Sequence, residues 1–185
     1  MSSARLPSRQ HAIQLVGPGE LRHNPAKEVP QPGPRQIVAR VEAVGLCFSD
    51  LKLLKQFSGH ARKGEIIEGL DPRVLREIPS YVPGLTPTVP GHEVSCRIVA
   101  VGSDVRRHRL NERCLVQTDY RALRTAESNA AFGYNFEGGL QEYVLMDERV
   151  VIDPESGERF LISVGEDLSA LSLIHISEPT RQAEI

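Results

Sequence analysis

The sequence lacks tryptophan, and aromatic side chains make up only 5% of its 185 residues. Platforms of stacked aromatic rings, which bind single-stranded nucleic acids, are therefore not expected. An excess of charge of one sign is also missing, because 22 lysines and arginines stand against 24 aspartates and glutamates. The basic patch or stripe that usually marks a nucleic-acid-binding protein is therefore not indicated. We expect no nucleic-acid partner.

Long apolar runs are missing as well. No stretch approaches the roughly 20 apolar residues that a membrane-spanning helix needs, so no membrane association is expected. The first residues contain two arginines but no continuous apolar segment after them, unlike a secretory signal. There are three cysteines, and an odd number without a signal segment argues against a disulfide framework. These features predict a cytoplasmic protein with free thiols.

What is present is the composition of an ordinary globular domain, with 40% apolar and 25% charged residues. Apolar residues at strand spacing predict strands at 11–16, 36–45, 93–101, 113–118, 140–146, 150–152 and 160–164. Proline-rich connections are expected at 25–34 and 79–90. Short helices are predicted at 49–54, with Ser49 or Asp50 as N-cap, and at 71–77, with Asp71 as N-cap. The sequence therefore predicts a mainly β domain, a barrel or sandwich with short helices.

Two short segments place metal-binding residue types beside carboxylates. One follows the second predicted strand and contains Cys47 and Asp50, and the other opens the third and contains His92 and Glu93. Thiolate, imidazole and carboxylate are the usual ligands of zinc, and a catalytic zinc keeps one position open for water or substrate. Either carboxylate could be a ligand or could orient the imidazole. The spacing also leaves a structural interpretation open, with Cys47 as a small buried residue and His92 as a hydrogen-bonded histidine at a strand edge.

Four motifs follow one another in the chain: Gly-Leu-Cys-Phe-Ser-Asp at 45–50, Pro-Gly-His-Glu at 90–93, Val-Ala-Val-Gly-Ser-Asp-Val at 99–105 and Glu-Gly-Gly-Leu-Gln-Glu-Tyr-Val at 137–144. This order resembles the N-terminal catalytic domain of zinc-dependent medium-chain alcohol and polyol dehydrogenases. The resemblance implies that residues 1–170 form a GroES-like, partly open β-barrel with short helices. It also implies that the Rossmann domain, which binds NAD or NADP, lies further along and is absent here, since no Gly-x-Gly-x-x-Gly fingerprint occurs.

The resemblance assigns roles to individual residues. Cys47 and His92 match zinc ligands, and Glu93 matches an acid beside the metal that can exchange with its water. Ser49 matches the hydroxyl that touches the substrate oxygen and begins a proton relay, while Asp50 matches the carboxylate that holds the histidine. One catalytic zinc is implied and no structural zinc, because the four-cysteine lobe of many members has no counterpart in this sequence.

The implied activity is hydride transfer between NAD(P) and an alcohol, polyol or sugar phosphate, in a full-length protein that is a homo-oligomer. The long segment between Asp50 and His92 is more similar to sugar-phosphate reductases such as L-sorbose 1-phosphate reductase. Two other interpretations stay open: a metal-free reductase that resembles quinone reductases, and a GroES-like module that binds a partner through residues 55–90. Zinc content separates the first interpretation from both alternatives.

The last residues do not continue the pattern of the domain. Residues 171–185 resemble the translation of a sequencing adapter, and we expect them to be non-native. The domain would then be incomplete near residue 170, and the third protein ligand of the family's zinc would lie beyond it. Glu178 and Pro179, which mimic a ligand motif of polyol dehydrogenases, are interpreted as a coincidence. We therefore expect this chain alone to be inactive.

The other cysteines and histidines receive structural interpretations. Cys96 and Cys114 lie inside predicted strands and are expected in the core. Three histidines are expected to face solvent: His11, His23 and His108. His60 lies in the long segment and could line a substrate entrance, and Lys52 falls where the resemblance places relay or cofactor contacts.

Overall fold

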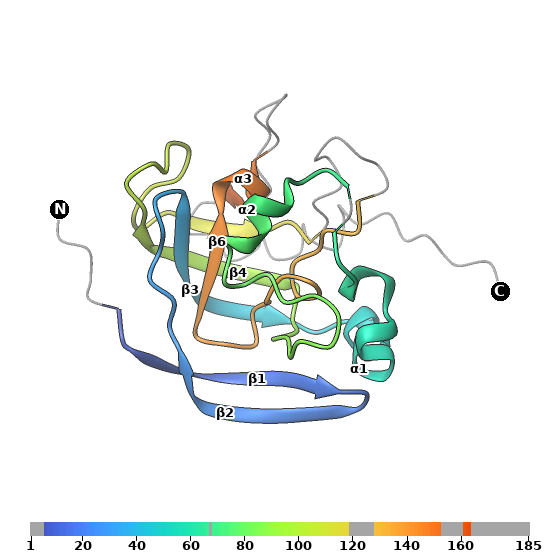
Figure 1. Ribbon diagram of the computed structural model, residues 1–185. Coiled ribbons are helices and arrows are strands. Elements are labelled where there is room, and N and C mark those ends of the chain that lie inside the picture. The colour runs from blue at the N-terminus through green and yellow to red at the C-terminus, as the bar shows by residue number, and fades with distance from the viewer. Residues whose placement is uncertain (1–5, 67, 119–127, 153–160, 164–185) are drawn as a thin grey trace.

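The computed structural model describes residues 6–66, 68–118, 128–152 and 161–163, and the structural statements below concern these residues. They form a five-stranded sheet in the order β6-β3-β4-β5-β7 and a two-stranded sheet of β1 and β2, with all neighbours antiparallel (Figure 1). The larger sheet does not close on itself. The prediction of a mainly β, partly open GroES-like architecture with short helices is confirmed.

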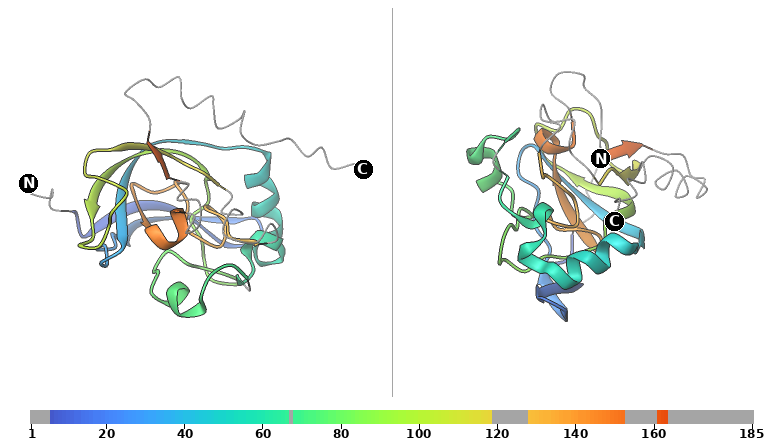
Figure 2. Two further views of the ribbon diagram at one scale, coloured as in Figure 1. Left: turned by 90° about the horizontal axis from the view of Figure 1, so that it is seen from above. Right: turned by 90° about the vertical axis from the view of Figure 1, so that its right-hand side faces the viewer.

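The strands are β1 (Arg9–Gly17), β2 (Glu20–Glu28), β3 (Gln36–Gly45), β4 (Glu93–Val101), β5 (Arg113–Val116), β6 (Tyr143–Asp147) and β7 (Leu161–Ser163). The helices are α1 (Phe48–Gln56), α2 (Pro72–Arg76) and α3 (Glu148–Val151), with 3₁₀ turns η1 (Phe57–Gly59) and η2 (Ala61–Lys63). In Figure 1 the β1–β2 hairpin runs below the larger sheet, and α1 lies beyond the end of β3. The two views in Figure 2 show the same elements from above and from the side.

The main hydrophobic core is built on the larger sheet. β3, β4 and β6 contribute fully buried apolar residues, among them Ile37, Ile98 and Val144. Cys96 of β4 and Cys114 of β5 face each other in the ladder and are both buried, which confirms their predicted place in the core. Burying apolar side chains of this size stabilises the fold by about 1.5–3 kcal/mol each.

The helix predicted at 49–54 is present, but its N-cap was predicted wrongly. Cys47 is the cap, and its Sγ accepts the backbone N–H of Ser49 at 3.3 Å. The Asp50 carboxylate accepts the N–H of Cys47 at 2.9 Å, which completes a capping box. A thiol is an unusual cap, so the sequence pattern favoured the common residue types. The cap fixes Cys47 and Asp50 relative to each other.

Two strand predictions also need correction. β2 was not predicted, because Pro25 suggested a loop, yet the hairpin pairs β2 with β1 in a two-stranded sheet, where a proline is tolerated. The strand predicted at 150–152 is wrong, because residues 148–151 form α3. The Asp147 carboxylate caps this helix by accepting the N–H of Arg149 at 3.0 Å.

The long segment between α1 and β4 is tied down by a buried lysine. Lys63 of η2 is fully buried and donates to the carbonyls of Val82 and Thr86, the second at 2.8 Å. A buried ammonium group is tolerated when its donors find such partners. The predicted helix within this segment is confirmed as α2, and the Asp71 carboxylate caps it by accepting the N–H of Arg73 at 2.7 Å. The buried lysine therefore joins η2 to the later part of the same segment.

Residues 171–185, which we expect to be non-native, lie outside the described residues. Among the residues that are described, no helix is long and apolar enough to cross a membrane.

Candidate metal centre

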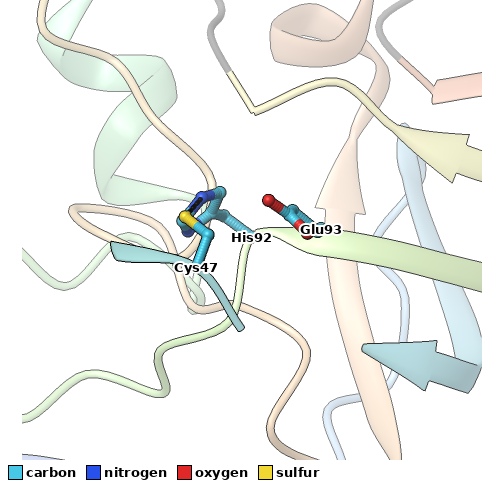
Figure 3. A group of neighbouring side chains, drawn as sticks. All are labelled: Cys47, His92 and Glu93. Atoms are coloured by element: carbon cyan, nitrogen blue, oxygen red, sulfur yellow. Dashed lines mark hydrogen bonds between the residues drawn. The ribbon is translucent and has the colours of Figure 1, made fainter. Parts of the chain in front are cut away.

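Cys47, His92 and Glu93 lie together where β3 ends and β4 begins (Figure 3). Their potential ligand atoms are all within 4.8 Å of one another. Cys47 Sγ and His92 Nε2 are 3.2 Å apart, close to the separation of about 3.5 Å that two ligands of one tetrahedral zinc have at the usual Zn–S and Zn–N lengths. The donor types and their convergence therefore fit a zinc ion.

Strand register brings these three residues together. Gly45, at the end of β3, is the ladder partner of Glu93, at the start of β4. The chain then turns from β3 into α1, which places Cys47 beside the first residues of β4. A Cβ atom at Gly45 would lie 2.5 Å from Glu93 Oε2, so the glycine leaves the space that the carboxylate occupies. Sequence spacing alone could not show this convergence.

Asp50 contacts the two segments that carry the candidate ligands Cys47 and His92. Its carboxylate accepts the backbone N–H of Cys47 at 2.9 Å and that of Gly91 at 3.2 Å. Asp50 Oδ1 also lies 3.3 Å from His92 Nδ1, a contact that is longer and less well aligned than a standard hydrogen bond. Burial alone would raise the pKa of Asp50, but the contact with His92 and the backbone donors outweigh it and lower the pKa. Asp50 is therefore ionised at neutral pH.

His92 has the orientation that a metal-binding histidine needs. The side chain is 1% exposed, and its Nδ1 faces a carboxylate while its Nε2 faces the Cys47 thiol. A carboxylate beside Nδ1 favours the tautomer that leaves the Nε2 lone pair available. Burial raises the pKa of Cys47, and the side chain of Ser49 and the N–H groups of Ser49 and Asp50 offset this only in part. A bound cation would reverse that effect and favour the thiolate.

Glycines let a second loop pack directly under His92. Gly91 has a φ of +90°, in the region that favours glycine, and its carbonyl accepts the N–H of Gly139 at 2.7 Å. A Cβ atom at Gly138 would lie 2.2 Å from that same carbonyl oxygen. The glycine pair in the motif at 137–144 therefore serves close backbone contact with the segment that carries His92.

Tyr134 is the site residue that the sequence analysis missed. Its ring is buried and lies 5.4 Å from the His92 ring. Burial raises the pKa of Tyr134, so the phenol stays protonated at neutral pH. No spacing rule connects Tyr134 with Cys47 or His92, because the contact arises from the loop that the glycines hold in place. Ser49 is half-buried and lies next to Cys47 in α1.

Comparison with known proteins identifies the family of this chain. The model of the alcohol dehydrogenase GroES-like domain matches residues 33–155. The chain is 29% identical over 145 residues to D-altritol 5-dehydrogenase of Agrobacterium fabrum, which covers 72% of this chain and 35% of that protein. It is 30% identical over 106 residues to sorbitol dehydrogenase of Bos taurus, which covers 57% of this chain and 24% of that protein.

Solved structures show the same fold. One is described as a short chain alcohol dehydrogenase from Escherichia coli complexed with NADH, and it matches with a TM-score of 0.57 at 21% identity, over 86% of this chain and 40% of that chain. The present chain spans 35% of the length of the altritol dehydrogenase and less of the sorbitol dehydrogenase. Since the family model matches more than half of the chain, this protein belongs to the family of alcohol dehydrogenase GroES-like domains.

Proposed function

We propose that this chain is the catalytic domain of a zinc-dependent dehydrogenase, and that Cys47, His92 and Glu93 hold its catalytic zinc. The observation that carries the proposal is the convergence of a thiol, an imidazole and a carboxylate within 4.8 Å. A metal-free reductase or a partner-binding module would need no such group. The orientation of the imidazole by Asp50 supports the same proposal, because metal-binding histidines usually contact a carboxylate through their second nitrogen.

The positions of the chain's own residues support a proposed role for each. When bound, zinc supplies a Lewis acid that lowers the pKa of a hydroxyl group toward neutrality. Ser49, two residues after Cys47 in the first turn of α1, is the proposed acceptor of the proton of a substrate hydroxyl, which it passes outward. Asp50 holds the orientation of His92. Glu93 is the third candidate ligand, and its carboxylate would alternate with a water molecule as a ligand of the metal.

The substrate class follows from the relatives. Two of them bear the names D-altritol 5-dehydrogenase and sorbitol dehydrogenase, so a polyol or a related sugar derivative is the proposed substrate. NAD or NADP is the proposed hydride acceptor, bound by a Rossmann domain of the full-length protein. One zinc per chain, at the catalytic site, is proposed.

Zinc content and turnover test this proposal together. The full-length protein should contain one zinc per chain and reduce NAD(P) in the presence of a polyol. Cys47→Ser should lose both properties, whereas Cys96→Ala, which changes a buried cysteine of β4, should keep the zinc. Turnover that survives complete metal removal would support the metal-free reductase instead. Zinc binding without any polyol-dependent turnover would support a binding module.

A further inference from the structure

Two histidines face each other on the β1–β2 hairpin, which runs below the larger sheet (Figure 1). His11 Nδ1 and His23 Nε2 are 3.0 Å apart. Their rings are stacked, with centroids 5.2 Å apart and planes 19° from parallel. Both side chains are exposed, so an ion from the solvent reaches them without any opening of the fold. The hairpin therefore presents two imidazole nitrogens at one point of its surface.

Strand pairing holds the two histidines side by side. His23 of β2 is the ladder partner of Ile13 of β1. His11 lies two residues before Ile13, and alternate residues of a strand share one face, so the two histidines are diagonal neighbours within reach of each other. The register of the hairpin also shifts between Gln10 and Ala12, and such a bulge changes the direction of the neighbouring side chains. The pair is thus positioned by the backbones of two strands.

A carboxylate lies beside the pair. Glu142 Oε2 accepts the backbone N–H of His11 at 2.8 Å, and among the residues that the structure describes its other oxygen has no hydrogen-bond partner. A negative charge at this place favours a bound cation. Arg22, the residue before His23, forms an ion pair with Glu20 at 3.0 Å, so its positive charge is compensated. The electrostatic surroundings therefore favour a cation between the two rings.

The separation of the two nitrogens fits two ligands at a right angle. At metal–nitrogen lengths of about 2.0–2.1 Å, ligands at 90° are about 2.8–3.0 Å apart, whereas the ligands of a tetrahedral ion are about 3.3 Å apart. The observed 3.0 Å agrees with the right-angle arrangement. Imidazole ligands in a square-planar or tetragonal arrangement are typical of Cu²⁺ and Ni²⁺. Each neutral ring can keep its proton on the nitrogen that faces away from the ion.

We propose that His11 and His23 form a second metal site, which binds one Cu²⁺ or Ni²⁺ ion with water as the remaining ligands. The site is independent of the proposed function, because it shares no residue with the candidate metal centre. Its two ligands belong to different strands, so the bound ion connects β1 with β2 and stabilises the folded hairpin. Co²⁺ binds such sites less tightly than Ni²⁺ or Cu²⁺ does, so cobalt fills the thiol-containing centre first.

Calorimetric titration with Ni²⁺ tests the site in the Cys47→Ser variant, which lacks the thiol of the metal centre. Ni²⁺ is the probe because Cu²⁺ is reduced by free thiols such as the two that remain. We expect one bound equivalent, and His11→Asn and His23→Asn should each weaken binding by at least about tenfold, which corresponds to about 1.4 kcal/mol. His60→Asn, which removes a histidine elsewhere in the chain, is the matched control and should leave the affinity unchanged. Absence of saturable binding, or equal affinities in all three variants, would overturn the site.

Amide NMR spectra of the same titration locate the ion. Paramagnetic Ni²⁺ should broaden the signals next to His11 and His23 before those next to His92. Broadening that begins next to His92 would show that the remaining groups of the metal centre bind the ion, and it would overturn the assignment to the hairpin.

Thermal unfolding tests the connection between the two strands. Ni²⁺ should raise the midpoint of the Cys47→Ser chain, and this increase should be lost when His23→Asn is added, because the ion then has a ligand on one strand only. An increase of the same size in both chains would contradict the proposal that the ion connects β1 with β2.

Discussion

His92 comes just before β4 and His108 lies in the loop after it, and both are buried. The Nδ1 atom of each ring lies beside a carboxylate, but the Nε2 atoms face different groups. His92 Nδ1 lies 3.3 Å from Asp50, and His108 Nδ1 lies 2.9 Å from Glu148. Each carboxylate also accepts two backbone N–H groups. His108 Nε2, however, lies 3.2 Å from the carbonyl of Leu161, whereas His92 Nε2 faces a thiol.

The second ring nitrogen therefore distinguishes a structural histidine from a candidate ligand. In His108 both nitrogens have oxygen partners, so the ring connects the loop after β4 with α3 and β7. The prediction that His108 faces solvent is wrong, because the ring is 4% exposed. The predictions for His11 and His23 are confirmed, since both are exposed. A carboxylate–histidine pair alone does not indicate a metal site.

The largest difference between the two histidines should be in metal affinity. His92→Ala removes a ligand, so we expect the affinity of this chain for Co²⁺ to fall by more than the 10–100-fold that loss of a supporting partner causes. His108→Ala should leave the affinity unchanged. Competition with a coloured chelator measures both values. Equal losses in the two variants would show that metal affinity follows overall folding rather than this site.

A smaller effect on Co²⁺ affinity is expected from the carboxylates beside the two histidines, Asp50 and Glu148. Asp50→Asn keeps the size of the side chain but weakens the orientation of His92, so Co²⁺ affinity should fall about 10–100-fold. Glu148→Gln, its counterpart beside His108, should leave Co²⁺ affinity unchanged. The same chelator competition gives both numbers. An unchanged affinity in Asp50→Asn would show that the long contact between Asp50 and His92 does not orient the ring.

The free energy of unfolding should depend on His108, although Co²⁺ affinity should not. His108→Ala leaves the buried carbonyl of Leu161 and the Glu148 carboxylate without this partner, which should cost about 1–3 kcal/mol of the free energy of unfolding. Urea denaturation measures this loss, with His23→Ala as the exposed control. A loss no larger than that of the control would mean that His108 does not connect the loop to β7.

The smallest expected effect is on the pH dependence of stability. Burial alone would raise the pKa of Glu148, but the N–H groups of Arg106 and Arg107 and the contact with His108 outweigh it and lower the pKa. A lowered pKa in the folded state stabilises the fold above the unfolded value, and this stabilisation is lost as pH falls through the folded value. When the pH is lowered from neutral to acid, the urea midpoint of unfolding should therefore fall less in Glu148→Gln than in the unmodified chain. An equal fall would contradict this.

The sequence predicted the elements whose signals are local. β4 has the predicted bounds 93–101 because a stretch rich in β-branched and apolar residues ends at Gly102, and α2 was marked by Asp71 followed by proline. The same reasoning failed where distant contacts decide the outcome. α3 depends on capping by Asp147, and the burial of His108 depends on Glu148 and Leu161.

The candidate ligands were found from residue type and from the family resemblance, because a thiol and an imidazole beside carboxylates limit the possible chemistry. Their convergence depends on the register between β3 and β4, which no local pattern encodes. Tyr134 could not be identified for the same reason, since its contact with His92 depends on how the glycine-containing loop packs.

Absorption spectroscopy during a Co²⁺ titration tests the central claim most directly, because thiolate coordination to cobalt gives a charge-transfer band. We expect one equivalent of bound Co²⁺ with this band in the unmodified chain. The band should be lost in Cys47→Ser and retained in Cys96→Ala, the buried cysteine of β4. Binding without the band, or a band that persists in Cys47→Ser, would contradict the claim that Cys47, His92 and Glu93 hold the metal.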